Sequence, residues 1–278
     1  MHAELERLNQ WFRANKLCLN TQKTKYIIFR PQTAQTMDYE RSLEINEQNI
    51  ERIGNNLNTK SFKFLGINID ETTSWKFHID HICNKKSSAN YIIKKAKHFL
   101  PNSCLMTLYQ SLIQCHINYG LEAWGSSSSI ERLYKLQKRS IRTINKKSYN
   151  YHTEPLFKKC KILTVRDQYK LNVSIFMHRY KNNKLPKSFM YLDYFTPPLR
   201  PTRQINTANQ KRARTKYSSL LPYHNFPKLW NDLAPVYRTI DSVNTFKTKL
   251  RTYFLDKYMA SVRCSNRRCR QCFPELFI

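Results

Sequence analysis

The sequence predicts an α+β fold that is mainly α, with a small antiparallel sheet near the N-terminus, then a helical region, then an irregular and basic C-terminal region. Three patterns predict this order. Short alternating apolar runs occupy positions 17–70, apolar residues recur at helical spacing from Trp75 onward, and prolines interrupt the periodicity after Asp193. At 278 residues and 41% hydrophobic composition, the chain can bury a core.

The chain is strongly basic. Its 48 Lys and Arg residues against 19 Asp and Glu residues give a formal net charge of +29, and nucleic acid is the first candidate for the polyanionic partner that such an excess indicates. An anionic membrane surface is the alternative partner. The sequence has no run of about 18 uncharged apolar residues, which is the length needed to span a bilayer. The acid-bearing N-terminus is unlike a secretory signal, so we expect an intracellular protein with reduced cysteines.

The N-terminal region predicts a helix, a turn and several strands. Apolar residues at helical spacing predict the helix over about 4–15. Residues 20–24 supply turn chemistry, and 26–29 form an aromatic and β-branched run of strand length. Between 42 and 70, alternating apolar residues predict a hairpin and one further strand, which Gly66 interrupts.

Helical periodicity dominates the rest of the chain. Apolar spacing, prolines at helix boundaries and the capping pair Thr164 and Asp167 define the predicted segments. We predict helices over residues 75–100, about 105–113, 129–146, a short one from 155, 165–178 and 243–258.

The helix predicted over 129–146 carries the strongest functional signal of these. At about 100° per residue its basic side chains fall within an arc of roughly 120°, opposite its apolar side chains. A surface helix usually mixes charges of both signs, yet no acid lies between Glu131 and Glu154. This pattern favours a face that binds phosphates over a solvated face without a ligand. The basic residues of this face are Arg132, Lys135, Lys138, Arg139, Arg142 and Lys146.

Two C-terminal features each allow two interpretations. Residues 194–231 combine prolines, aromatics and cations such as Arg212 and Arg214 without any acid, which suits either single-stranded nucleic acid or a loosely ordered basic linker. The tail carries Cys264, Cys269 and Cys272 in a C-x4-C-x2-C arrangement. These thiolates could bind zinc, but the tail offers no fourth ligand, so free thiols are the other interpretation.

The order of several motifs resembles one family. The N-terminal region resembles reverse transcriptases of non-LTR, LINE-type (jockey-like) retrotransposons, in the segment that follows their active site. The residues that carry this resemblance are Leu8, Trp11, Asn15, Leu17, Leu19, Asn20, Lys23, Thr24 and Phe29. The likeness covers nearly the whole chain, through KFLGINID (63–70), SWKFHIDHI (74–82), LYQSLI (108–113), LQKRSIR (136–142) and FKTKL (246–250).

The resemblance implies three parts: residues 1–70 as the C-terminal part of a palm, 71–150 as a helical thumb that grips the template–primer duplex, and 151–278 as a basic C-terminal extension with the cysteine tail. It also implies RNA and DNA as partners and a nuclear location. Leu65 and Gly66 are similar to the primer grip, although a bulge that only curves the sheet would explain Gly66 equally well.

Two further positions are compared with the family pattern, and one matches it while the other departs from it. Lys23 matches a lysine proposed to protonate the departing pyrophosphate. Family members usually read WN, any residue, LP before the last helix, whereas this chain has Ala234 in place of the proline, which puts the geometry of that turn in question.

Polymerisation needs carboxylates held together to bind two Mg²⁺ ions. In the family these are one aspartate and an adjacent Asp-Asp pair upstream of the matched segment, whereas the eight aspartates of this chain are isolated. We therefore expect the C-terminal part of an RNA-directed DNA polymerase that is not an enzyme as it stands, uses no cofactor, retains an inactive Lys23 and binds RNA and DNA, with the missing N-terminal part as a further partner. The alternatives are a truncated gene model of a complete reverse transcriptase and a host-adopted protein-binding scaffold.

Overall fold

The computed structural model describes residues 2–31, 43–45, 48–54, 59–195 and 207–260. The fold is mainly α with small two-stranded sheets, as the sequence predicts. It divides once, after Asp80, into an N-terminal unit (Met1–Asp80) and a C-terminal unit (His81–Ile278). The sequence predicts divisions after 70 and 150 instead. Residues before and after 150 belong to one unit because α6 (Ile130–Ile144) packs against α7 (Glu154–Lys159) and α8 (Val165–Lys181). The roles of the three expected parts stay predictions.

The first helix of the N-terminal unit, α1, spans His2–Ala14 and confirms the predicted helix. Asn15 ends it by donating its Nδ2 to the Trp11 carbonyl at 2.8 Å, and Lys16 leaves the helix with a φ of 55°. Leu5 packs against the small core of this unit, which consists of Leu43, Ile45 and Ile50. Trp11, on the same helix, is exposed.

Over the described residues of the N-terminal unit, the strands form three separate pairs rather than one antiparallel sheet. The pair β2 (Glu44–Ile45) with β3 (Gln48–Asn49) is antiparallel, and so is β5 (Phe62–Phe64) with β6 (Ile67–Ile69). The pair β1 (Lys25–Ile27) with β4 (Glu51–Ile53) is parallel, with Lys25 opposite Glu51. The Lys25 Nζ lies 2.6 Å from a Glu51 carboxylate oxygen, so an ion pair supports a parallel pairing that the alternation did not predict.

Gly66 lies in a turn and not within a strand, which corrects the prediction of one further strand. Leu65 and Gly66 connect β5 to β6 with φ values of 45° and 84°. A two-residue hairpin turn of type I′ requires positive φ at both positions, and glycine meets that requirement without strain. The glycine therefore closes a hairpin, and the bulge interpretation is wrong.

The buried carboxylate of Asp70 organises the start of the next helix, α2 (Lys76–Ala96). It accepts hydrogen bonds from the backbone N–H groups of Ser74 and Trp75, both at 3.1 Å, and from the hydroxyl groups of Thr72 and Ser74. These bonds satisfy donors just before the first helical turn, where an anion is also favoured by the helix dipole. Asp70 is thus a structural capping residue.

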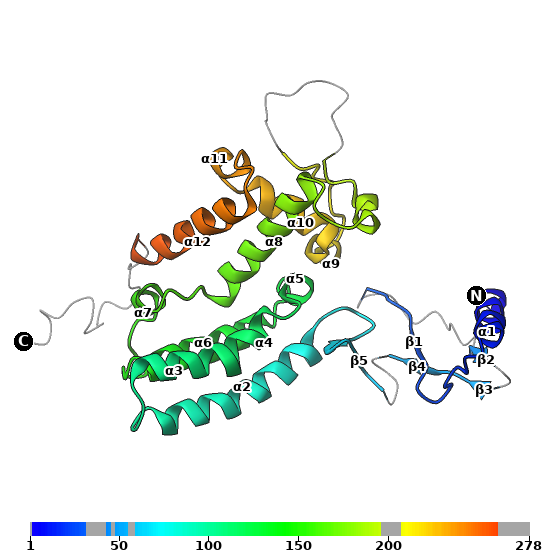
Figure 1. Cartoon of the computed structure of the whole chain (residues 1–278), viewed down its shortest axis with the longest axis horizontal. Helices are drawn as coiled ribbons and strands as arrows, with labels where there is room; N and C mark the ends of the chain where they lie inside the picture. The colour runs from blue at the N-terminus through cyan, green and yellow to red at the C-terminus, as the bar shows by residue number, and fades with distance from the viewer. Residues whose placement is uncertain (1, 32–42, 46–47, 55–58, 196–206, 261–278) are drawn as a thin grey trace, which may run out of the picture. The chain divides into compact units, whose positions relative to one another are not determined.

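The C-terminal unit consists of helices in two layers (Figure 1). One layer contains α2, α3 (Asn102–Tyr109), a π-helical turn (Gln110–Gln114), α4 (Cys115–Asn118), α5 (Leu121–Trp124) and α6 (Ile130–Ile144). The other contains α8 (Val165–Lys181), α10 (Pro222–Asn231) and α12 (Val243–Ala260). Shorter elements connect them, namely α7 (Glu154–Lys159), a 3-10 turn (Lys187–Leu192), α9 (Lys216–Leu220) and α11 (Pro235–Arg238).

Buried Gln137 of α6 ties the two layers together. Its Nε2 donates to the Tyr109 hydroxyl and to the Leu163 carbonyl, each at 3.0 Å, and its Oε1 accepts from the Val165 N–H at 2.8 Å. A buried amide with all of these partners satisfied fixes one packing arrangement. Val165 begins α8, whose predicted cap is confirmed by the bond from the Asp167 N–H to the Thr164 hydroxyl.

Residues 207–231, the described part of the region before Asp232, are more regular than the prolines of this region predict. Pro222 occupies the first turn of α10, where a missing N–H costs nothing. Pro227 lies inside the same helix and removes one internal hydrogen bond. Burial of the neighbouring Phe226 and Trp230 side chains compensates for this loss. Helix α10 packs against α8, where Phe226 contacts Phe176 with ring centroids 5.4 Å apart.

Ala234, which departs from the family pattern, has a backbone conformation that suits proline. Its φ is −59° and its ψ is 141°, and it directly precedes Pro235. Proline fixes φ near −65°, and a residue before proline prefers this extended ψ. We expect Ala234→Pro to raise the free energy of unfolding by about 0.4–1 kcal/mol by restricting the unfolded chain. Urea unfolding followed by circular dichroism measures this change.

The matched control for that variant is Ala234→Gly, which should lower the free energy of unfolding because it adds freedom to the unfolded chain. A destabilised Ala234→Pro protein would show that the Ala234 N–H is needed in the turn. The denaturant slope should stay the same in all three proteins, since none of the changes alters the surface exposed on unfolding.

Candidate nucleic-acid interface

Helix α6 separates its basic residues from its apolar residues. Leu133, Ile141 and Ile144 are buried on one side, while Arg132, Lys135 and Arg139 are exposed on the other. The buried side packs against α3 and α8, and against α2 through the bond from the Ser140 hydroxyl to Asn90. The predicted amphipathic helix is therefore confirmed, and its role in binding nucleic acid stays a prediction.

Lys138 and Arg142 belong to the same basic side of α6, but they are partly buried and contact aromatic rings. The Lys138 Nζ is 4.5 Å from the centroid of the Tyr134 ring, and the Arg142 guanidinium is 5.6 Å from that of Tyr149. Arg142 also donates its Nε to the Tyr151 carbonyl at 2.7 Å. Arg142 thus holds the segment after α6 in place, and only part of its charge is available to a ligand.

The helix ends two residues before the predicted end. Ile144 is its last residue, Asn145 caps it, and Lys146 follows in the left-handed region with a φ of 53°. Lys146 is exposed, as the face requires, but it belongs to the turn after α6. Its neighbour Lys147 donates its backbone N–H to the Arg142 carbonyl at 3.0 Å.

Three tyrosines complete the surface, and sequence reasoning missed them. Tyr134 contacts both Lys138 and Arg166, and the Lys147 Nζ is 5.0 Å from the Tyr151 ring. Tyr149 is 80% exposed, so its ring is accessible for stacking on a base. The sequence signal was present as tyrosines interleaved with cations between 134 and 151. We call the residues Arg132, Lys135, Lys138, Arg139, Arg142, Tyr134, Tyr149 and Tyr151 the α6 surface.

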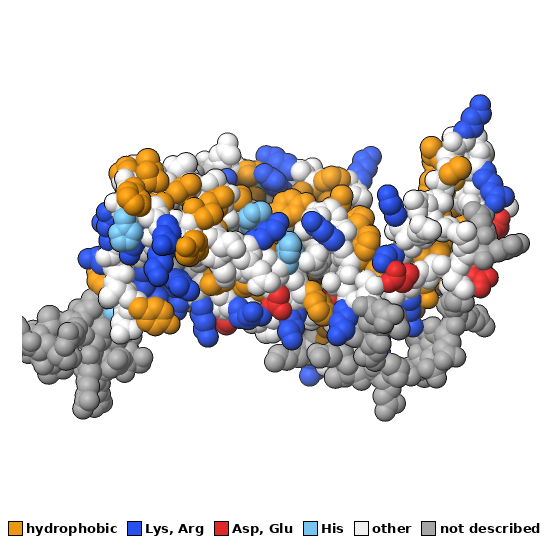
Figure 2. All heavy atoms as spheres, turned by 90° about the horizontal axis from the view of Figure 1, so that it is seen from below, with side chains coloured by type: hydrophobic (Ala, Val, Ile, Leu, Met, Phe, Trp, Pro, Cys, Tyr) orange, Lys and Arg blue, Asp and Glu red, His pale blue; other side chains and the backbone are white. Residues whose placement is uncertain are grey.

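Two cations of the α6 surface lie in surroundings that disfavour their charged form, mainly because they are partly buried. Partial burial lowers the pKa of Lys138, and the neighbouring charge of Arg142 lowers this pKa further. Burial also lowers the pKa of Arg142. A bound anion relieves such crowding of like charges, because it favours the charged form of each cation. Figure 2 shows Lys and Arg side chains spread widely over one face of the molecule, with few acidic side chains among them.

Acidic side chains also act on this region, among them Glu154 at the start of α7, whose charge opposes the lowering of the Lys138 pKa, and Glu131 in the first turn of α6. Glu131 pairs with Arg166 of α8, whose guanidinium lies 5.1 Å from the Tyr134 ring centroid. The pair connects α6 to α8 at the edge of the α6 surface.

The remaining predicted binding residues lie elsewhere. Arg212 and Arg214 are exposed in the segment that leads into α9, and α9 packs against α10 rather than α6. Cys264, Cys269 and Cys272 fall outside the described residues, as do the cations and prolines at 197–203. The structure therefore does not bring Arg212 and Arg214 into the α6 surface.

Three of the family-matched positions of the N-terminal unit, Lys23, Leu65 and Gly66, are exposed. Lys23 lies in a turn that Asn20 closes by accepting the Lys23 N–H with its Oδ1 at 3.1 Å. Leu65 is 74% exposed at the tip of the β5–β6 hairpin, with Gly66 beside it. These geometries suit turn residues, and neither position contacts a cluster of carboxylates that is described in the structure.

The carboxylates of the described residues do not fit the magnesium pair of a polymerase. Within residues 2–31, 43–45, 48–54, 59–195 and 207–260, no three His, Cys, Asp or Glu side chains converge on a point where a metal ion could bind. Buried Asp70 uses its carboxylate for the four hydrogen bonds that start α2.

Two further findings bear on the class of protein. No helix in the described part of the chain has both the length and the apolar composition needed to cross a bilayer. Comparison of the chain with protein-family models, with curated proteins and with solved structures found no match in any of the three.

Proposed function

We propose that the chain is the part of a non-LTR retrotransposon reverse transcriptase that contains the end of the palm, the thumb and a basic C-terminal extension. In this proposal the chain binds template–primer duplexes of RNA and DNA without regard to sequence. Support comes from the order of the family-like motifs along the chain and from the helical C-terminal unit, which has the composition expected of a thumb.

The α6 surface is the single observation that carries the binding function. Cations on one side of a well-packed helix present charge at intervals of one turn, as phosphate binding requires. The nearby tyrosine rings add flat contacts that do not depend on base identity. The net charge of +29 also attracts an anionic duplex to the protein over a distance.

Catalysis is not part of the proposal. A two-metal polymerase site needs neighbouring carboxylates, and the aspartates of this chain are separated in sequence. Lys23 has no role as a general acid when no pyrophosphate is formed. Primer extension with the purified chain, magnesium and deoxynucleotides should therefore give no product, and nucleotide incorporation would contradict this part.

The salt dependence of binding tests the proposed function. If about six phosphates are neutralised, the affinity for a short RNA–DNA duplex should fall roughly a thousandfold between 50 and 200 mM salt. Fluorescence anisotropy of a labelled duplex measures the affinity at each salt concentration. A flat salt dependence would contradict binding through the α6 surface.

A further inference from the structure

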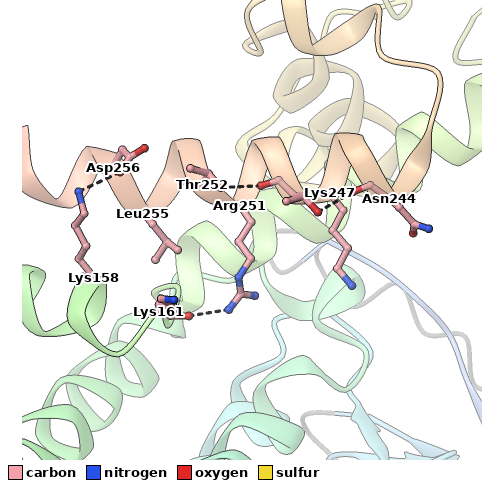
Figure 3. Close-up of a pocket in the computed structure, with 9 residues that line it drawn as sticks. Lys158, Lys161, Asn244, Lys247, Arg251, Thr252, Leu255 and Asp256 are labelled. Atoms are coloured by element: carbon pink, nitrogen blue, oxygen red, sulfur yellow. Dashed lines mark hydrogen bonds and ion pairs between the residues drawn. The ribbon is translucent and has the colours of Figure 1, made fainter.

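A second basic site lies on the side of α12 that faces α7. A groove of about 620 Å³ lies between α12 on one side and Lys158 and Lys161 on the other, and Figure 3 shows its lining side chains. A second recess of about 330 Å³ adjoins it toward α3, α4 and α8. Lys161, Lys247 and Arg251 line both spaces, so these three cations lie where the groove and the recess meet. We call the two spaces together the α12 groove.

The positions of these cations follow from the helix geometry. Lys247 and Arg251 are four residues apart and extend from the same side of α12 toward the opposite wall (Figure 3). Lys161 follows α7 with a φ of 54°. The Arg251 guanidinium donates to the Lys161 carbonyl at 2.7 Å, which holds the arginine across the gap.

Charge is unevenly distributed along the α12 groove. Asp256 is the one acid among its described lining residues, and its carboxylate lies 3.0 Å from the Lys158 Nζ. That pair neutralises one end of the groove. The cations Lys161, Lys247 and Arg251 then make the other end positive, next to the smaller recess.

The smaller recess is lined by side-chain amides together with apolar groups. Amide pairs bond to each other along single helices, Gln114 with Asn118 and Gln168 with Asn172, each at 2.8 Å. Each amide retains further donor and acceptor capacity. The described lining residues that supply amides or apolar surface are Gln110, Gln114, Asn118, Gln168, Asn172, Ile162, Leu163, Leu171 and Ile175.

We propose that the α12 groove binds single-stranded nucleic acid, with a phosphate at Lys161, Lys247 and Arg251 and the adjacent base in the amide-lined recess. Cations suit the phosphodiester, and amides with apolar neighbours suit the edges and faces of a base. A recess of this volume is within the range of small-ligand sites and is far too small for a duplex. The inference goes beyond the proposed function, which concerns duplexes on the α6 surface.

The test uses the full chain, a labelled oligonucleotide of about ten thymidines and the duplex of the salt titration. Lys247→Gln should weaken binding of the single strand about fourfold at physiological salt and reduce its salt slope by roughly 0.7, because one cation–phosphate contact is lost. Affinity for the duplex should stay the same. Lys247 is exposed, so the variant should fold normally.

Lys249→Gln is the matched control, because Lys249 is exposed on α12 and does not line either space. It removes the same charge from the same helix and should leave single-strand binding nearly unchanged. The inference is overturned if Lys247→Gln binds the single strand as the parent chain does, if both variants lose affinity equally, or if the parent chain does not bind the single strand. A parent chain that binds the single strand through Lys247 but does not bind the duplex would overturn the proposed function and leave this inference supported.

Discussion

Replacing Lys135, Lys138 and Arg139 together by glutamine is expected to weaken binding of a short RNA–DNA duplex about a hundredfold at physiological salt. Each neutralised phosphate contributes roughly a fivefold gain in affinity under that condition, and three contacts are removed. The salt slope should fall by about 2.7 for the same reason. Fluorescence anisotropy over a salt series measures both quantities.

The choice of residues for this variant follows from the structure. Lys135 and Arg139 are exposed, and the partly buried Lys138 lies over the face of the Tyr134 ring. Arg142 is left in place because its bond to the Tyr151 carbonyl holds the segment after α6. The triple variant should therefore keep the thermal unfolding curve of the parent chain.

A matched control separates the α6 surface from net charge. Replacing Lys94, Lys184 and Lys249 by glutamine removes three exposed charges at positions outside α6. We expect this control to lose at most a few-fold in affinity, through long-range electrostatics that salt screens. Equal losses in the two triple variants would contradict a specific role for α6.

The second large effect concerns Lys86, whose side chain is buried in the C-terminal unit. The residue is 1% exposed, and its Nζ donates to the Ile113 carbonyl at 2.5 Å. Ile113 lies in the π-helical turn between α3 and α4, where the regular hydrogen-bond pattern is interrupted. Burial lowers the pKa of Lys86 to about 7.

This lowered pKa predicts that stability rises with pH. The unfolded chain holds the lysine proton up to a pKa of about 10.4, while the folded chain releases it from about pH 7. Between these values the unfolded state binds more protons, so the free energy of unfolding should increase by up to about 1.4 kcal/mol per pH unit. The contribution is complete above the unfolded pKa and is lost as the pH falls through the folded pKa.

Lys86→Met should remove this pH dependence between about pH 7.5 and 9.5. The variant should also be more stable than the parent near pH 7, because it avoids the cost of burying a charge. Above this window the tyrosines add a second pH dependence to the free energy of unfolding, because burial raises the pKa of Tyr109 and of Tyr194 in the folded state. Urea unfolding at a series of pH values gives the required free energies.

The control for this variant is Lys94→Met, an exposed position on the same helix. It should retain the rise in stability that the parent chain shows. A parent chain with pH-independent stability in this window, or a Lys86→Met protein that keeps the rise, would show that Lys86 is not the titrating group.

Local signals predicted much of the helical fold. The periodic apolar residues of α6, the Thr164 cap of α8 and the start of α12 at Val243 are all encoded within one or two turns of sequence. Such signals depend on neighbours in the chain, so a single sequence contains them. The basic side of α6 could be predicted for the same reason.

The features that sequence missed depend on contacts between distant segments. The parallel pairing of β1 with β4 is set by residues 26 positions apart in the chain, and alternation cannot report such a register. Pro227 predicts a break in α10, but Phe226 and Trp230 near it in α10 are buried, and packing against α8 keeps α10 helical. The α12 groove combines residues from three parts of the chain, none of which carries a motif for it.

The contacts of Arg142 also could not be predicted from helical periodicity alone. The arginine belongs to the basic arc of α6, but its position beside the following segment gives it a bond to the Tyr151 carbonyl. Periodicity assigns a side of the helix and does not show what packs next to it. A structural role was therefore hidden among residues predicted to bind phosphate.

Photo-crosslinking tests the claim that α6 and its tyrosines bind the duplex most directly. An RNA–DNA duplex with photoreactive thymidines would be irradiated with the chain, and the modified peptides would be identified by mass spectrometry. The account predicts crosslinks within residues 132–151, with Tyr149 prominent because its ring is the most exposed of the three tyrosines. Crosslinks confined to other parts of the chain would contradict it.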